Sequence, residues 1–179
     1  MNTRNTRVSV ITRTKNRPLL LPRAAESVRC QNINKLIWIV VNDGGCKVDV
    51  ETVIQDFRSR CDIEVIVIHN ETSAGMEAAT NIGIAACDSD YIVIHDDDDS
   101  WEPGFLPACL RFLHEKDSYK GVISLTTTVQ EKVEGTTVKK LDSQPFNSHL
   151  QSVDCYCTQP YHQTFEGSVG TCPKNRRSW

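Results

Sequence analysis

The sequence predicts an α/β fold in which helices flank a mostly parallel sheet. Strand-like and helix-like segments alternate over residues 7–116, an order typical of parallel strands joined by crossover helices. The segment 36–41 is apolar throughout, as a strand buried on both faces requires. With 39% hydrophobic and 24% charged residues, the 179-residue chain has the composition of a globular protein and can bury a sizeable core.

The first part of this pattern contains two strand–helix units. Residues 7–12 form the first expected strand, and a polar loop leads from it to a helix with an apolar stripe at positions i, i+3, i+4 and i+7. The second strand, 36–41, ends at the turn-forming run 42–45, and the next helix carries a similar stripe. The stripe residues are Leu21, Ala24, Ala25 and Val28 in the first helix and Val50, Val53, Ile54 and Phe57 in the second.

Two more units follow. The third strand is expected over 64–68 and the third helix over 75–86. The fourth strand, 91–94, runs directly into a histidine and four successive aspartates, and the fourth helix begins after 101–103. The residues expected to share one side are Ala78, Ile82 and Ala85 in the third helix and Leu106, Leu110 and Leu113 in the fourth.

After residue 120 the composition changes toward valine, isoleucine and threonine. Segments 121–130 and 135–141 are separated by the short run EKVEG, so we expect a β-hairpin or a pair of short strands. Residues 151–179 hold three of the eight cysteines and show no helical or strand periodicity. The sequence therefore predicts an α/β region over 1–116, a β-rich extension of the same domain over 117–150 and an irregular tail over 151–179.

Charge and hydropathy exclude several classes of protein. The formal net charge is -3 and the sequence pI is about 5.9, so no global positive field is available and no nucleic-acid partner is expected. The longest apolar run, 36–41, is far shorter than the roughly 20 residues of a membrane-spanning helix. The N-terminus has no signal-peptide apolar region. We expect no transmembrane segment, a cytoplasmic location and free thiols.

The loops that follow the strands meet at one edge of a parallel sheet, where ligands bind. Four such loops, 13–17, 42–45, 69–75 and 96–99, carry most of the unusual polar residues. The last consists of four aspartates, and two carboxylates about 4 Å apart repel by roughly 4 kcal/mol at an effective dielectric of 20. We expect Mg²⁺ or Mn²⁺ to compensate this charge, held by one or two carboxylates and completed by phosphate oxygens and water. The alternative is a solvated acidic loop.

The first two loops point to nucleotide contacts. Loop 13–17 supplies three cations within five residues beside a helix N-terminus, so we expect it to face phosphate, with ordinary surface charges as the alternative. Asp43 ends a buried strand. It is expected either to accept a hydrogen bond from a nucleobase N–H or to cap the following turn.

Four segments together resemble a known family. They are VSVITRTKNRP, IWIVVNDGG, a His-Asn pair followed by glycine, asparagine and glycine in the third helix, and YIVIHDDDDSWEPGFL. Over residues 7–116 they resemble the nucleotide-sugar-binding half of the inverting glycosyltransferases of family 2, which have the Rossmann-like GT-A fold. The resemblance implies metal-dependent transfer of a sugar from a nucleoside-diphosphate sugar to an acceptor, either a glycan or a lipid-linked glycan.

The resemblance also implies roles for individual residues. Thr14, Asn16 and Arg17 fit the family's T-x-N-R motif, and Asp43 corresponds to the acid that contacts the base. Asp98 corresponds to the direct metal ligand of the Asp-x-Asp motif. The implied nucleotide-sugar-binding residues are Arg13, Thr14, Asn16, Arg17, Asp43, Asp96 and Asp97, and the implied metal ligands are Asp98 and Asp96.

The chain departs from the family pattern at two positions and in one motif. Asn42 replaces the first acid of the family's Asp-Asp-Gly, and Thr80 replaces the arginine that commonly precedes the helix asparagine. In the family an aspartate in a later acidic motif is the base that deprotonates the acceptor hydroxyl. The acids after Leu141 are Asp142, Asp154 and Glu166, none beside another acid. The sequence therefore names no base, and its aperiodic ending is typical of a truncated or frame-shifted product.

Three other interpretations compete with transfer. A non-catalytic nucleotide-sugar-binding fragment is favoured by the missing base. A nucleotidyltransferase calls for a glycine-rich phosphate loop after the first strand, and loop 13–17 has no glycine. Zinc binding in the tail is disfavoured because the spacing matches no standard zinc motif. The tail residues concerned are Cys155, Cys157, His162 and Cys172.

Overall fold

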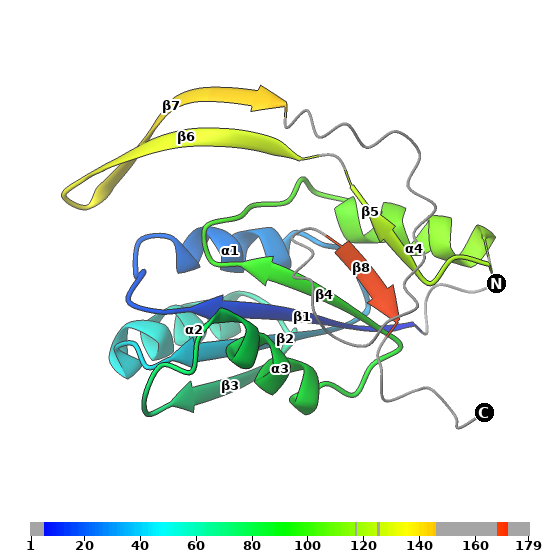
Figure 1. Cartoon of the computed structure of the whole chain (residues 1–179), viewed down its shortest axis with the longest axis horizontal. Coiled ribbons are helices and arrows are strands. Elements are labelled where there is room, and N and C mark those ends of the chain that lie inside the picture. The colour runs from blue at the N-terminus through cyan, green and yellow to red at the C-terminus, as the bar shows by residue number, and fades with distance from the viewer. Residues whose placement is uncertain (1–5, 117, 125, 146–167, 172–179) are drawn as a thin grey trace.

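A computed structural model describes residues 6–116, 118–124, 126–145 and 168–171 (Figure 1). Its main sheet has six strands in the order β3-β2-β1-β4-β8-β5, and the four long strands at the start of this order are parallel. The strand β8 runs antiparallel to both of its neighbours. The bounds are β1 Arg7–Thr14, β2 Lys35–Asp43, β3 Glu64–Asn70, β4 Tyr91–Asp96, β5 Gly121–Ile123 and β8 Ser168–Thr171. The predicted α/β fold class is confirmed.

Helices cover both faces of the sheet. One face packs against α1 (Leu21–Arg29), α2 (Lys47–Arg60) and α4 (Phe105–Glu115), and the other against α3 (Met76–Ala86). The apolar stripes predicted for the first two helices and the fourth helix enter the first of these layers. Trp38, the largest fully buried side chain, anchors that layer: its ring lies 4.6 Å from the ring of Phe57, and its Nε1 donates to Thr12 Oγ1 at 2.9 Å.

Each of the four parallel strands ends two residues later than the sequence pattern predicts. The strand β1 ends at Thr14, β2 at Asp43, β3 at Asn70 and β4 at Asp96, because the polar residues at these ends still pair with the neighbouring strand. Arg13 therefore lies in the sheet beside Asp96, its partner in the register of β1 and β4, and not in the following loop. This correction brings the site residues onto rigid strand ends.

The predicted buried side of α3 is wrong by about one residue. Ala85 is exposed and Ala78 and Ile82 are only partly buried, whereas Ala79, Thr80 and Gly83 face the sheet. The reason is a close approach at Gly83, where a Cβ atom would overlap Cγ2 of Ile11. A stripe of alanine and isoleucine is a weak marker of the buried face when a glycine lets the backbone itself contact the sheet.

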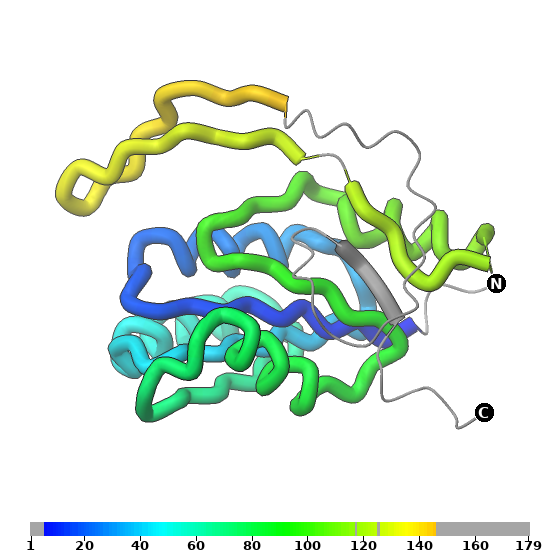
Figure 2. The backbone as a smooth tube through the Cα atoms, viewed as in Figure 1, coloured from blue at the N-terminus to red at the C-terminus, as the bar shows by residue number. Residues whose placement is uncertain are grey.

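A separate hairpin follows the main sheet. Its strands are β6 (Thr127–Glu134) and β7 (Thr137–Pro145), and Gly135 supplies the left-handed turn conformation at φ +62°. The hairpin confirms the prediction for this region, but most of the run EKVEG belongs to β6, and β5 joins the main sheet. Figures 1 and 2 show the hairpin as an arm that extends along the top of the view, toward the side where β1 and β4 end.

The segment 151–179 is only partly described. Four of its residues, Ser168–Thr171, form β8, so the expectation of an irregular tail is wrong for these four. The acids Asp154 and Glu166 and the zinc alternative at Cys155, Cys157, His162 and Cys172 lie outside the described residues. The division at 116 and 150 stays a prediction.

Two further observations concern the described part of the chain. None of its helices combines the length and the apolar character needed to cross a membrane. Its five cysteines are thiols, as predicted: Cys30, Cys46, Cys61, Cys87 and Cys109.

Candidate functional site

The carboxyl ends of β1 and β4 bring arginines and aspartates together. Arg13, almost fully buried, donates from Nε to Asp96 Oδ1 at 2.8 Å and pairs with the same oxygen through Nη2. Its Nη1 donates to Thr80 Oγ1 at 3.0 Å. Thr80, noted above as a departure from the family pattern, therefore anchors the guanidinium that neutralises Asp96.

The next two aspartates share a different arginine. Arg17 Nη1 lies 3.0 Å from Asp97 Oδ1 and 2.6 Å from Asp98 Oδ2. Burial raises the pKa of Asp97, although hydrogen bonding to Thr14 and the charge of Arg17 oppose this effect. The Asp97 side chain is 6% exposed, whereas the side chains of Asp98 and Arg17 are each 49% exposed. A buried carboxylate, that of Asp97, and an accessible one, that of Asp98, thus contact the same guanidinium group of Arg17.

Asp96, the last residue of β4, lies apart from this pair, which follows in the turn after the strand. Its carboxylate contacts Arg13, whereas Asp97 and Asp98 contact Arg17. The two residues expected to hold the metal ion, Asp98 and Asp96, thus contact different arginines. The two aspartates that share one arginine are Asp97 and Asp98.

The fourth aspartate and the strand histidine complete the acidic loop. Burial raises the pKa of Asp99 to about 6, and the charges of Asp96 and Asp98 act in the same direction. Burial lowers the pKa of His95 to about 4, so its ring, which lies 4.1 Å from that of Trp101, is neutral near pH 7. The histidine therefore adds no positive charge to the site.

The acidic loop is tied to the first helix. Arg23 in α1 donates through Nη2 to the main-chain oxygen of Asp98, and its Nη1 contacts both carboxylate oxygens of Glu131 on β6 at 2.6 and 2.7 Å. Ser27 Oγ accepts from the Trp101 N–H at 3.1 Å. Arginines thus compensate much of the charge for which the sequence argument invoked a metal ion, and the loop is held in place.

Asp43 has a role that neither sequence alternative described. Its carboxylate accepts four hydrogen bonds from the end of β3 and the loop between β3 and α3. Burial alone would raise the pKa of Asp43, but these bonds outweigh burial and hold it well below its ordinary value. The donors are Asn70 Nδ2 at 2.8 Å, Ser73 Oγ at 2.7 Å and the N–H groups of Ala74 and Gly75 at 2.8 and 3.0 Å.

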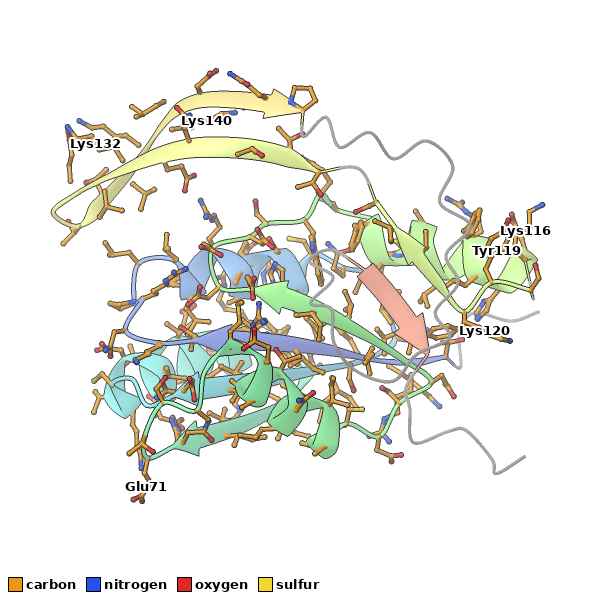
Figure 3. All side chains as sticks on the ribbon, viewed as in Figure 1. Glu71, Lys116, Tyr119, Lys120, Lys132 and Lys140 are labelled. Atoms are coloured by element: carbon orange, nitrogen blue, oxygen red, sulfur yellow. The ribbon has the colours of Figure 1, made fainter. Side chains whose placement is uncertain are left out.

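Asp43 therefore holds the loop between β3 and α3 and does not cap the turn that directly follows β2. Asn42 closes that turn instead, accepting from the Gly45 N–H and donating to the Gly45 carbonyl, both at 2.9 Å. Asn42 Nδ2 also lies 3.1 Å from His69 Nδ1. Glu71, the acid of the fastened loop, points away from the sheet (Figure 3). A nucleobase contact by Asp43 remains a prediction, and it would use an oxygen that already has two donors.

Asn16 and Thr14 fix the path of the first loop. Asn16 has a left-handed backbone conformation at φ 55°, and its Oδ1 accepts from the Cys46 N–H at 2.9 Å. This bond joins the loop after β1 to the loop after β2. Thr14 is buried beside Asp97. The contacts of Asn16 and Thr14 thus stabilise the loop that carries Arg17, at the carboxyl edge of the sheet.

The carboxylates of this site fit a hard cation that uses few protein ligands. Among the described residues no three His, Cys, Asp or Glu side chains surround a common point. Mg²⁺ usually takes only one or two carboxylates and completes its coordination with phosphate oxygens and water, so such a cluster is not required. Asp97 and Asp98 offer two carboxylates at one place, and the half-exposed Asp98 is open to solvent.

The fold and these contacts together define the class: an α/β protein with a cluster of charged side chains at the carboxyl edge of a parallel sheet, the edge where ligands bind in such folds. The chain belongs to glycosyl transferase family 2, whose model matches residues 9–167. It is 34% identical over 104 residues to a pre-mycofactocin glycosyltransferase of Mycobacterium tuberculosis, a match that covers 58% of this chain and 20% of that protein. The chain spans 20 to 40% of the length of the curated relatives it matches.

Solved structures of GT-A glycosyltransferases share the fold. The mannosyltransferase PcManGT of Pyrobaculum calidifontis, in complex with GDP-Man and Mn²⁺, superposes with a TM-score of 0.60 at 20% identity, over 66% of this chain and 35% of that chain. Residues 1–349 of S. aureus TarS, in complex with UDP-GlcNAc, superpose with a TM-score of 0.59 at 19% identity, over 65% and 33% of the two chains. These likenesses confirm the predicted GT-A fold.

Some residues of the site carried no sequence signal. Arg23 lies inside a helix and Glu131 in a hairpin that follows long afterwards, so no local spacing links them to the aspartates. Asn70 ends β3 and Ser73 lies in the loop after it, at the edge that the sequence predicted, but their bonds to Asp43 depend on the register of β2 and β3.

Proposed function

We propose that this region binds a nucleoside-diphosphate sugar at the carboxyl edge of its sheet, and that the protein transfers the sugar to an acceptor hydroxyl with inversion. The observation that carries the proposal is the meeting of Arg13 and Arg17 with three successive aspartates at the ends of the neighbouring strands β1 and β4. Membership of the family supports it. The acceptor class we propose is a glycan or a lipid-linked glycan.

Each charged group has a separate task in this proposal. Arg17, half exposed on the first loop, reaches the diphosphate, because guanidinium matches phosphate oxygens in a bidentate geometry. Asp98 with Asp97 holds Mg²⁺ or Mn²⁺, and Asp96 stays with Arg13, facing the ribose. The metal ion, when bound, neutralises charge on the departing diphosphate. The GDP-Man and Mn²⁺ in the structure of PcManGT support this assignment.

The remaining residues keep the edge rigid. Asp43 holds residues 70–75 at the start of α3, and Asn16 holds the first loop against the second. Rigid strand ends position reacting groups with less loss of order than mobile loops. Inversion also requires a base for the acceptor hydroxyl. We assign none: Asp142 lies on β7, where its carboxylate accepts bonds from the Ser143 N–H and from Gln144.

A second candidate function is binding of the nucleotide sugar without transfer. It requires only the charged groups of the donor site and no base for the acceptor hydroxyl. The two candidates share the donor site and differ in turnover. Release of free sugar or of a glycosylated acceptor from a labelled nucleotide sugar distinguishes them.

Calorimetric titration with UDP and with GDP, with and without Mn²⁺, tests the donor site. We expect Mn²⁺-dependent binding of one nucleotide to the full chain and its loss in Asp98→Ala. Asp62→Ala is the matched control, because it removes the same charge from an exposed residue that precedes β3 at the opposite edge of the sheet. Binding of neither nucleotide, or equal effects of the two substitutions, contradicts the proposal.

A further inference from the structure

We propose that Arg17 competes with the divalent cation for the Asp97–Asp98 pair, and that the diphosphate of the donor resolves this competition by drawing Arg17 away. Arg17 then acts as a switch that makes metal binding depend on nucleotide binding. This inference rests on the donor site proposed above and adds to it an order of events and a residue responsible for that order.

The contacts place one nitrogen where a metal ion would bind. Nη1 of Arg17 bridges Asp97 Oδ1 and Asp98 Oδ2, at 3.0 and 2.6 Å. A hard cation seeks the same two oxygens, since carboxylates are its preferred protein ligands. The guanidinium and the metal ion are both positive, so the two occupy this position in turn. The charge of Asp97 is also the main reason why the pKa of Arg17 is raised.

Arg17 is free to move in a way that Arg13 is not. Half of the Arg17 side chain is exposed, and it starts from a loop outside the strand. Arg13 is 6% exposed and is fixed by Asp96 and Thr80. An approaching diphosphate therefore attracts Arg17 and leaves the Arg13–Asp96 pair intact. Asp97 and Asp98 then present both carboxylates to the metal ion.

The exchange improves the balance of charge at the two carboxylates. Before it, one guanidinium faces two carboxylates; after it, a divalent cation faces the two carboxylates and the guanidinium faces phosphate. Nucleotide and metal each favour the state that the other requires, so their affinities rise together. By linkage, the factor by which nucleotide strengthens metal binding equals the factor by which metal strengthens nucleotide binding.

Mn²⁺ titration of the full chain without nucleotide tests the competition directly. We expect Arg17→Ala to bind Mn²⁺ about tenfold more tightly than the wild-type chain, within the usual range of coupling between sites. Lys15→Ala is the matched control, because it removes the same charge from the same exposed loop and the described residues show it no contact with the aspartates. This control should change Mn²⁺ affinity less than about twofold.

A second titration measures the coupling. With UDP or GDP present, Mn²⁺ affinity should rise about tenfold in the wild-type chain and much less in Arg17→Ala. Arg17→Lys keeps the charge but loses the planar guanidinium group. Its rise in Mn²⁺ affinity should lie between those of the wild-type chain and Arg17→Ala. Circular dichroism and thermal melting confirm that each variant is folded, as expected for a half-exposed side chain.

The outcomes separate this inference from the donor site itself. If Arg17→Ala binds Mn²⁺ no more tightly than Lys15→Ala, including the case in which neither binds it, the competition is overturned, even when wild-type chain binds nucleotide with metal. If Arg17→Ala alone gains Mn²⁺ affinity but no variant binds UDP or GDP, the competition stands and the donor site is wrong.

Discussion

Arg13 and Arg17 divide the first three aspartates of the run between them. Arg13 neutralises Asp96 from 83 positions earlier in the chain, and Arg17 neutralises Asp97 and Asp98. A local argument treats the four acids as isolated charges and so overstates the need for a metal ion. The sequence identified both the acids and the cations, but their pairing depends on the register of β1 with β4, which local spacing does not reveal.

Asp43 is expected to contribute strongly to stability. Asp43→Asn replaces one carboxylate oxygen by an NH₂ donor, so one of the two main-chain N–H groups at the start of α3 loses its acceptor, and we expect the free energy of unfolding to fall by about 1–3 kcal/mol. Urea unfolding followed by circular dichroism measures the change. Asp62→Asn, at an exposed position, should be within about 0.5 kcal/mol of the wild-type chain.

Comparing the stability of the wild-type chain and Asp43→Asn at different pH values tests whether the carboxylate charge of Asp43 is the source of the stabilisation. Because the folded-state pKa of Asp43 is held below its ordinary value of 3.8, its contribution is complete above that pH and is lost as the pH falls toward the folded-state pKa. The stability difference between the wild-type chain and Asp43→Asn should therefore narrow from about pH 5 downward. A difference that stays constant down to pH 3 would show that the carboxylate charge is not the source.

The elements show where sequence patterns succeed and where they stop. Periodicity identified the four parallel strands and the four helices, because a buried stripe or an apolar strand is a local property. It ended each strand two residues early, since hydrogen bonding in the sheet continues through polar residues such as Arg13 and Asp43. It also missed β8, whose four residues owe their conformation to β4 and β5 on either side.

The hairpin illustrates the same limit. Enrichment in valine, isoleucine and threonine predicted its strands, but nothing local predicted that Glu131 would meet Arg23. Figure 3 shows Lys132 and Lys140 on the hairpin, away from the main sheet. An isolated two-stranded hairpin is marginally stable in water, so the Arg23–Glu131 pair is an important described link between this arm and the aspartate loop.

The packing of α3 gives a prediction about a single methyl group. Glycine to alanine normally stabilises a helix by about 1 kcal/mol, but at Gly83 the new Cβ would overlap Ile11. We expect Gly83→Ala to lower the free energy of unfolding by about 1–3 kcal/mol. A double-mutant cycle measures the coupling between positions 83 and 11. It compares urea unfolding of the wild-type chain, Gly83→Ala, Ile11→Ala and the double variant.

In the Ile11→Ala background the added methyl group has space, so its cost should fall by at least about 0.5 kcal/mol. A stabilising effect of Gly83→Ala in the wild-type background would contradict the close approach of α3 to β1.

The complete fold turns these local features into one site. Parallel β1 and β4 end at the same edge, so residues from distant parts of the sequence meet there, and the amino edge carries the loops that precede β3 and β4. The order of strands, more than any single motif, places cations opposite carboxylates. The resemblance to GT-A structures rests on this same fold.

Paramagnetic broadening by Mn²⁺ locates the donor site most directly. In NMR spectra of the labelled full chain with UDP or GDP, substoichiometric Mn²⁺ weakens amide signals steeply with proximity to the ion, and Mg²⁺ serves as the diamagnetic control. We expect the signals of residues 14–17 and 96–99 to disappear first, while those of 61–63 and 88–90 at the amino edge persist. Broadening that begins elsewhere, or that affects both edges equally, would contradict a donor site at the ends of β1 and β4.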